Sequence, residues 1–185
     1  MSTVNPQVCP VEKAGALDNK FRKLLQNPQK IVGPYLKGDM IVLDFGCGPG
    51  FFSIEIAKLL NNKGKVISAD LQKGMLDKIE HKISGTYLES KIELHQCSVN
   101  NIGLSDPVDF ILAFYVVHEV SDQKKLFTEF YSLLKENCKL LIVEPFFHVT
   151  KNKFADMLQI TAECGFKVAE KPKLFFSRAV LLTKS

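Results

Sequence analysis

The sequence predicts one α/β domain built on a mostly parallel sheet with helices on both faces. Apolar runs of strand length alternate with amphipathic runs of helix length along most of the 185 residues. The first apolar run breaks into closely spaced glycines and then opens a helix, as strand-to-helix turns do at ligand sites in parallel sheets. Only a short turn separates the last two apolar runs, so these two are predicted to form a hairpin.

Seven runs have the length and composition of strands. They cover Met40–Phe45, Lys65–Ala69, Lys91–Gln96, Val108–Phe114, Cys138–Glu144, Phe166–Glu170 and Leu174–Thr183. The last two are joined by Lys171-Pro172-Lys173, which is too short for a crossover helix. We therefore expect one antiparallel strand, from this C-terminal hairpin, in an otherwise parallel sheet.

Four amphipathic runs between the strands have helical periodicity. They cover Gly50–Leu60, Gln72–Ile83, Asp122–Leu134 and Lys151–Cys164. A further run, Leu17–Gln26, precedes the first strand and repeats Leu and Phe at helical spacing. We expect a single domain, 1–185, with a core over 28–185 and an N-terminal helical segment over 1–27. That segment either covers the site as a lid or simply closes the sheet.

Composition argues against several classes of protein. The formal net charge of +4 is mild and the lysines are dispersed, so no nucleic-acid partner is expected. No apolar run reaches the roughly 18 to 20 residues of a membrane span, and no signal peptide is recognised, which predicts a cytoplasmic protein. The five cysteines are odd in number and dispersed, so neither a disulfide framework nor a metal site is predicted.

The segment Val42–Gly50 contains the strongest functional signal in the chain. Its Gly46, Gly48 and Gly50 alternate with other residues immediately after an apolar strand. Glycine adopts positive φ without strain and lets a ligand lie against the backbone, while Pro49 suits the first turn of the following helix. The spacing G-x-G-x-G differs from the dinucleotide fingerprint G-x-G-x-x-G, so the sequence predicts a different kind of nucleotide site.

With Asp44 before the glycines, the string Val-Leu-Asp-Phe-Gly-Cys-Gly-Pro-Gly resembles motif I of the class I S-adenosylmethionine-dependent methyltransferases. The resemblance extends over roughly residues 28 to 183. It implies a Rossmann-like sheet with strand order 3-2-1-4-5-7-6 and S-adenosyl-L-methionine as the cofactor. The turn residues implied in cofactor binding are Asp44, Gly46, Cys47, Gly48 and Gly50.

The ends of the next strands supply further candidate cofactor residues, because ligands bind at the carboxyl ends of strands in such sheets. Asp70 ends the second strand and can accept two hydrogen bonds from a ribose diol. Its alternative role is to cap the helix that follows. Leu71 and Met75 are expected either against the adenine or in the core.

The resemblance also places the third and fourth strand ends at the cofactor. Within Cys97-Ser98-Val99, Ser98 stands where many family members have an aspartate that accepts the adenine amino group. A hydroxyl or a backbone carbonyl can still accept from that amine. Phe114 occupies the place where family members bring backbone close to the methionine part of the cofactor.

Methyl transfer from a sulfonium needs a general base only when the acceptor must lose a proton. His118 and Glu119 follow the fourth strand, where the acceptor is expected, and are the first catalytic candidates. His148, after the fifth strand, is the second. For His118 a packing or capping role is an equal alternative, and Glu144 is interpreted first as a wall of the site.

Three functions fit these residues. The first is in-line methyl transfer to a small, partly apolar acceptor, a group that includes quinone and sterol-type enzymes, indicated by Phe114–Val120 and the Pro145-Phe146-Phe147 segment. The second is a thiol or arsenite-type metalloid methyltransferase that uses Cys9, Cys47 and Cys97. The third is a non-catalytic module that binds S-adenosylmethionine. The sequence does not distinguish O-, N-, C- and S-methylation.

Overall fold

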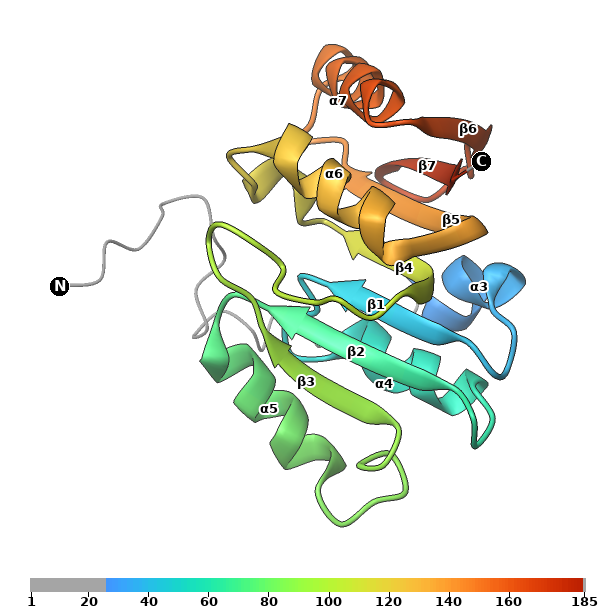
Figure 1. The fold of residues 1–185 in the computed structure, drawn as a ribbon, viewed down its shortest axis with the longest axis vertical. Helices are drawn as coiled ribbons and strands as arrows, with labels where there is room; N and C mark the ends of the chain where they lie inside the picture. Colours follow the sequence, from blue (N-terminus) through green and yellow to red (C-terminus); the bar gives the residue numbers. More distant parts are fainter. Residues whose placement is uncertain (1–25, 185) are drawn as a thin grey trace, which may run out of the picture.

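Seven strands form one sheet in the computed structural model, which describes residues 26–184 (Figure 1). The strands are β1 (Ile41–Phe45), β2 (Lys65–Asp70), β3 (Ile92–Gln96), β4 (Val108–Phe114), β5 (Leu134–Pro145), β6 (Phe166–Glu170) and β7 (Ser177–Lys184). Their order is β3-β2-β1-β4-β5-β7-β6. β7 pairs antiparallel with both β5 and β6, and the other pairs are parallel. The predicted architecture is therefore confirmed.

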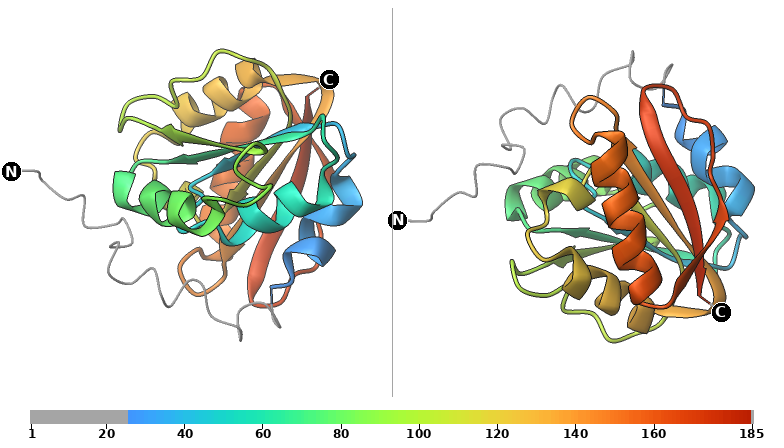
Figure 2. Two further views of the ribbon diagram at one scale, coloured as in Figure 1. Left: turned by 90° about the horizontal axis from the view of Figure 1, so that it is seen from below. Right: turned by 90° about the horizontal axis from the view of Figure 1, so that it is seen from above.

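Helices cover both faces of this sheet (Figures 1 and 2). One face carries α3 (Pro28–Val32), α4 (Phe51–Leu59) and α5 (Lys73–Ile83), and the other carries α6 (Gln123–Leu133) and α7 (Lys151–Glu163). Two short 3-10 turns, η2 (Gly33–Tyr35) and η3 (Val117–Glu119), complete the described elements. None of the helices between Gln26 and Lys184 has the length and apolar character that a membrane span requires.

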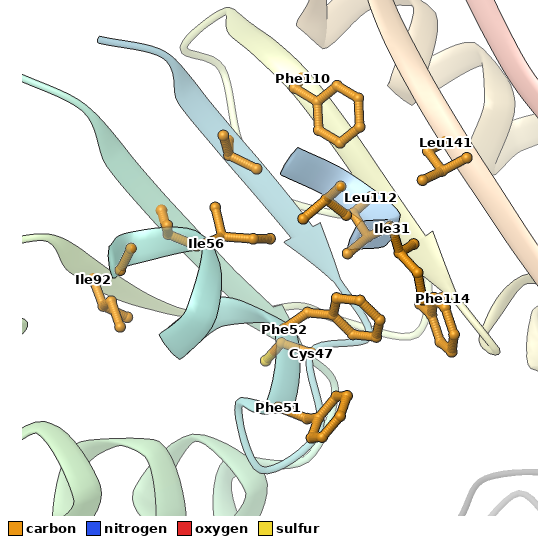
Figure 3. Close-up of a cluster of buried hydrophobic side chains, with 14 of the residues drawn as sticks. Ile31, Cys47, Phe51, Phe52, Ile56, Ile92, Phe110, Leu112, Phe114 and Leu141 are labelled. Carbon is orange, nitrogen blue, oxygen red and sulfur yellow. The ribbon is translucent and has the colours of Figure 1, made fainter. Parts of the chain in front are cut away.

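The central strands are buried on both faces, which explains their continuous apolar sequences. Successive residues of a strand point to opposite faces, so Phe110 and Leu112 pack toward α4 while Ile111 packs toward α6. The buried side chains form one apolar cluster on each face of the sheet. Figure 3 shows the cluster on the α4 face, in which the Phe52 ring lies 4.3 Å from the Phe114 ring between centroids. Each fully buried side chain of this size contributes about 1.5–3 kcal/mol to folding.

The starts of two strands differ from the prediction by more than one residue. β5 begins at Leu134, directly after α6, because Leu134 pairs with Val108. The register then shifts at a bulge, and Asn137 takes a positive φ of 60°. β7 begins at Ser177 and not at Leu174, so the hairpin connection is longer than Lys171-Pro172-Lys173.

The N-terminal part of the described chain adds a helix that the sequence analysis did not predict. In α3, Pro28 occupies the first turn and the Asn27 side chain accepts a hydrogen bond from the backbone nitrogen of Lys30. The predicted helix Leu17–Gln26 and its role as a lid lie outside the described residues, apart from Gln26.

The order of the strands places a ligand crevice at the carboxyl ends of β1 and β4. These strands are neighbours in the sheet, yet β2 and β3 lie to one side of them and β5 to the other. The chain therefore leaves β1 and β4 in opposite directions, and their connections separate above the sheet. The candidate site begins at this switch point.

Candidate functional site

A cavity of about 730 Å³ opens at the carboxyl ends of β1 to β5. This volume is typical of small-molecule and cofactor sites. Of the predicted site residues in the described chain, all but one line the cavity. They are Asp44, Gly46, Cys47, Gly48, Asp70, Leu71, Met75, Cys97, Ser98, Val99, Phe114, His118, Glu119 and His148. The exception is Gly50.

The three motif glycines have positive φ angles, but they serve different purposes. A Cβ at Gly46 would collide with the side chain of Val116, so Gly46 permits close packing. A Cβ at Gly50 would lie 2.8 Å from Ile79 Cγ1, so Gly50 lets α4 pack against α5 and does not face the cavity. A Cβ at Gly48 would meet nothing within 4 Å, so this backbone is open to a ligand.

Asp44 and Asp70 anchor the turn from opposite sides. Buried Asp44 accepts a hydrogen bond of 2.5 Å from the Ser53 hydroxyl of α4. Asp70 accepts one bond of 2.9 Å from the Gly48 nitrogen and another of 2.9 Å from the Gln72 nitrogen. Burial raises the pKa of Asp70, although the backbone bonds oppose this effect. Asp70 thus orients the glycine turn and the residue before α5, and the N-cap position of that helix is Gln72 and not Asp70.

The loop after β3 forms one edge of the cavity. The Ser98 hydroxyl accepts from the backbone nitrogens of Asn100 and Asn101, at 3.2 and 3.0 Å, and lies 3.0 Å from Asn101 Oδ1. These contacts engage the hydroxyl in the loop's own turn. Cys97 is buried beneath the loop and Val99 is exposed. The loop therefore presents backbone groups more readily than the Ser98 side chain.

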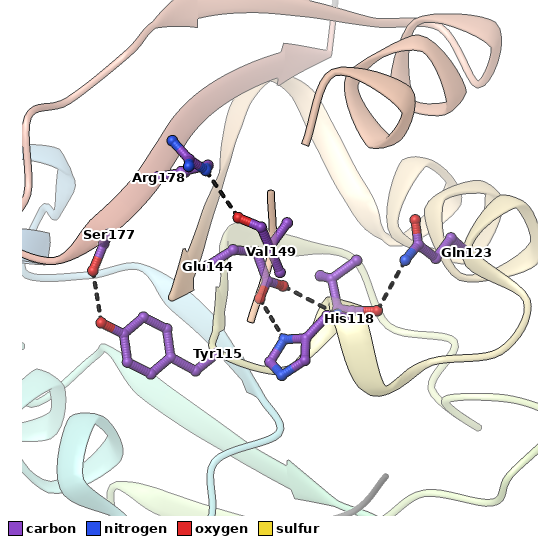
Figure 4. Close-up of polar contacts among 8 residues, drawn as sticks. Tyr115, His118, Gln123, Glu144, Val149, Ser177 and Arg178 are labelled. Carbon is purple, nitrogen blue, oxygen red and sulfur yellow. Dashed lines mark hydrogen bonds and ion pairs between the residues drawn. The ribbon is translucent and has the colours of Figure 1, made fainter. Parts of the chain in front are cut away.

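His118 lies on the opposite wall and is paired with Glu144, which is buried and does not itself line the cavity, in contrast to its expected place in the wall (Figure 4). The His118 Nδ1 lies 2.5 Å from one oxygen of Glu144, and the His118 backbone nitrogen donates to the other at 3.2 Å. Glu144 is only 1% exposed. Burial lowers the pKa of His118, but the hydrogen bond and charge of Glu144 raise it, and the net pKa lies above the ordinary 6.5.

Glu119 and His148 lie beside this pair. Burial raises the pKa of Glu119 to about 7, with a smaller opposing effect from His118 and a raising effect from Asp70. The His148 ring is exposed and its centroid lies 5.6 Å from that of His118. The structure therefore brings the three predicted catalytic residues to one wall, where His118 alone is oriented by a buried carboxylate. Such an arrangement suits proton transfer.

Tyr115, which shapes the same wall, was not predicted as a site residue. Tyr115 has a φ of 61°, a conformation that is uncommon for a residue with a bulky side chain. Its hydroxyl accepts from Gln26 Nε2 at 2.6 Å and lies 2.6 Å from the Ser177 hydroxyl of β7. No local pattern indicates such a conformation, because contacts distant in sequence hold it. Phe175 and Phe176 also line the cavity and were not predicted to, whereas Phe147 belongs to the segment that indicated an apolar acceptor.

The structure describes two of the three cysteines in the predicted cluster. Cys47 and Cys97 are both buried at the cavity, while Cys9 lies outside the described residues. Burial raises the pKa of Cys47 well above its usual range and that of Cys97 to about 12. A thiolate is the reactive form, so these environments favour inert thiols. Between Gln26 and Lys184, no group of three or more His, Cys, Asp or Glu side chains could hold a metal ion.

Comparisons with known proteins agree with this geometry. Residues 36–173 match a family described as "Methyltransferase domain". The chain is 31% identical over 110 residues to a demethylmenaquinone methyltransferase of Lactobacillus johnsonii, and 26% identical over 104 residues to the ubiquinone/menaquinone biosynthesis C-methyltransferase UbiE of Haemophilus ducreyi. These alignments cover 59% and 56% of this chain but only 45% and 40% of the relatives. The chain thus spans less than half the length of these curated relatives.

A solved structure of similar size matches the whole fold. It is a SAM-dependent methyltransferase from Aquifex aeolicus, with a TM-score of 0.86 and 26% identity, and the match covers 96% of this chain and 100% of that one. The family match extends over most of the chain, and the strand order and glycine turn are those implied by the resemblance. The chain therefore belongs to the class I S-adenosylmethionine-dependent methyltransferases.

Proposed function

We propose that the protein transfers a methyl group from S-adenosylmethionine to a small, partly apolar acceptor. The observation that carries the proposal is one cavity with two chemically different walls. The glycine turn and Asp70 form one wall, and His118, oriented by the buried Glu144, lies on the other. A donor and an acceptor bound in this cavity would meet between these walls.

The glycine wall fits the cofactor. The open space beside Gly48 leaves its backbone accessible, and a side chain there would fill that space. Each Asp70 oxygen accepts one bond from the backbone and retains capacity for a ribose hydroxyl. Leu71 and Met75 supply an apolar surface for the adenine, and the backbone of the loop after β3 replaces the engaged Ser98 hydroxyl as its polar partner.

The other wall fits an acceptor with an aromatic ring and a hydroxyl group. Phe114, Tyr115 and Phe147 line the cavity near His118. The two relatives above are named for menaquinone and ubiquinone, which supports an acceptor of the quinol class. The bound cofactor supplies an activated methyl group for in-line displacement, so orientation of the acceptor accounts for much of the catalysis.

His118 is proposed as the base that takes the acceptor's proton. Glu144 is a carboxylate that only accepts hydrogen bonds, so the Nδ1 of neutral His118 carries its proton toward Glu144. The Nε2 is then the basic nitrogen. The pKa of His118 is raised above 6.5. The fraction of His118 in its base form, and with it the methyl-transfer rate, should therefore increase as pH rises through this raised pKa.

The thiol or metalloid alternative has less support, because the buried thiols of Cys47 and Cys97 have raised pKa values. The non-catalytic alternative predicts cofactor binding that is independent of the acceptor wall. Loss of methyl transfer in His118→Ala with unchanged cofactor affinity would therefore separate an enzyme from such a module.

The test begins with calorimetric titration using S-adenosylmethionine, S-adenosylhomocysteine and NAD. We expect the first two to bind and NAD not to bind. Asp70→Asn should weaken binding by about 10- to 150-fold, the range for hydrogen bonds to a charged group. Asp77→Asn, which removes only an exposed ion-pair partner of Lys73, is the matched control. If neither sulfur compound binds, the proposed function is wrong; if both bind, labelled methyl donor is used to screen hydroxylated aromatic acceptors.

A further inference from the structure

Four phenylalanines form a continuous exposed surface at the mouth of the cavity. Phe146, Phe147, Phe175 and Phe176 are 43%, 66%, 59% and 50% exposed, and we call them the phenylalanine patch. Their rings are in sequential contact. Phe147 lies 5.7 Å from Phe146, Phe146 lies 5.5 Å from Phe176, and Phe176 lies 4.0 Å from Phe175, measured between centroids. Contiguous apolar surface of this kind marks an interaction site more often than scattered exposed residues do.

Two loops build the patch, and the sheet holds them together. Phe146 follows β5 and Phe176 precedes β7, and these two strands pair as far as Pro145 and Ser177. The Phe146 nitrogen donates to the Phe176 carbonyl at 3.2 Å. Strand pairing and this backbone hydrogen bond therefore fix the two loops next to each other.

The patch is continuous with the cavity. Phe147, Phe175 and Phe176 all line it, so their rings have one side toward the cavity and one toward solvent. A flat apolar surface that met the patch would stand directly at the cavity entrance. An apolar ligand could then enter from that surface without crossing water.

The two segments that carry the patch hold charges of a single sign. Segments 146–153 and 171–178, which contain the four phenylalanines, hold five basic residues and no acidic one. Lys151, Lys153, Lys171 and Lys173 are exposed, and Arg178 donates from Nε to the Val149 carbonyl at 2.9 Å. Exposed aromatics ringed by lysines are typical of proteins that lie on an anionic lipid surface, where the rings enter the headgroup boundary and the ammonium groups meet the headgroups.

We propose that the phenylalanine patch docks the protein peripherally on an anionic lipid bilayer, with the cavity mouth facing the lipid. The contact chemistry requires only the exposed rings and the surrounding lysines, so it goes beyond methyl transfer and does not depend on it. A second copy of this chain is the competing occupant, since two such patches could also cover each other.

The test is flotation of the full chain with vesicles of phosphatidylcholine alone and of phosphatidylcholine mixed with phosphatidylserine. We expect binding to the mixed vesicles, weaker binding to the neutral ones and a decrease with added salt. The double variant Phe147→Ser, Phe175→Ser should lower partitioning by about tenfold or more, because it removes two rings from the interface. Tyr87→Ser, which removes an equally exposed ring remote from the cavity, should leave partitioning unchanged.

Charge is tested separately from apolar contact. Lys171→Gln should lower partitioning about fivefold, as expected for one lysine near an anionic surface, whereas Lys63→Gln in the turn before β2 should not. Unchanged melting temperatures would show that the variants are folded. Failure to bind mixed vesicles, or binding that survives loss of the rings, overturns the proposal. Sedimentation without lipid identifies the competitor, because self-association abolished by Phe147→Ser, Phe175→Ser without vesicle binding would assign the patch to a second copy.

Discussion

Replacing Glu144 with glutamine alters the charge beside His118 while preserving the size of the side chain. The carboxylate accepts from both the Nδ1 and the backbone nitrogen of His118. It is also the main group that raises the pKa of His118 against the opposing effect of burial, with a smaller raising effect from Glu119. Without it the effect of burial remains, so the pKa of His118 should change from above 6.5 to below it.

The effect on stability can be worked out from the same contacts. The two His118 donors bind different oxygens of Glu144, and glutamine has an amide NH2 in place of one of these oxygens. While His118 is protonated, one hydrogen bond to a charged group is therefore lost. Such a loss lowers the free energy of unfolding by about 1.5–3 kcal/mol. The raised pKa of His118 also determines how this stabilisation changes with pH. The stabilisation by protonated His118 is complete below its unfolded pKa, near 6.5, and is lost as pH rises through the folded pKa.

The assay is an NMR titration of the His118 ring in both proteins, combined with urea unfolding at several pH values. The difference in unfolding free energy between the proteins should be largest at low pH and should diminish above the folded pKa of the native chain. The glutamine amide can also donate to Nδ1, which moves the ring proton to Nε2 and removes the proposed base. An unchanged pKa for His118 in Glu144→Gln would refute the pairing and the proposed role of the base with it.

Three further predictions test other parts of the site. Gly46→Ala should lower the unfolding free energy in urea more than Gly48→Ala does, because both positive-φ positions add about 1–2 kcal/mol of strain but only a Cβ at Gly46 collides; equal losses would contradict the packing argument. The folded pKa of Glu119 is raised to about 7, so this carboxyl stabilises the protein at low pH and loses that contribution as pH rises through 7. Glu119→Gln should therefore make the decrease in unfolding free energy with pH less steep. Parallel curves of unfolding free energy against pH for the two proteins would count against it. Iodoacetamide should alkylate Cys47 and Cys97 slowly near neutral pH, as mass spectrometry can show, and rapid labelling would restore the thiol alternative.

Most of the fold was predictable because its signals are local. The central parallel strands are largely apolar runs, and α6 and α7 begin after residues that cap them, Asp122 and Thr150. The start of β5 was not predictable in this way. Leu134 belongs to the strand because it pairs with Val108, and the bulge at Asn137 that follows depends on tertiary contact.

On the cofactor side of the cavity, too, local signals were predictable and tertiary contacts were not. The glycine turn and Asp70 could be located because a turn that exposes backbone demands particular residue types in a fixed pattern. The contacts of individual side chains could not be predicted from the sequence. Ser98 keeps its hydroxyl for its own loop, and Gly50 packs on Ile79, which only the folded neighbours determine.

The acceptor wall depends on a strained residue whose partners are dispersed along the chain. Holding Tyr115 at positive φ costs about 1–3 kcal/mol, so contacts elsewhere must stabilise it. Its nitrogen donates to the Val143 carbonyl at 2.8 Å, and its hydroxyl meets Gln26 and Ser177. Hydrogen bonds of Tyr115 thereby connect the wall to β5, to β7 and to Gln26. Changes in the β6–β7 connection should therefore alter the acceptor side of the cavity, while the glycine turn that faces the cofactor stays as it is.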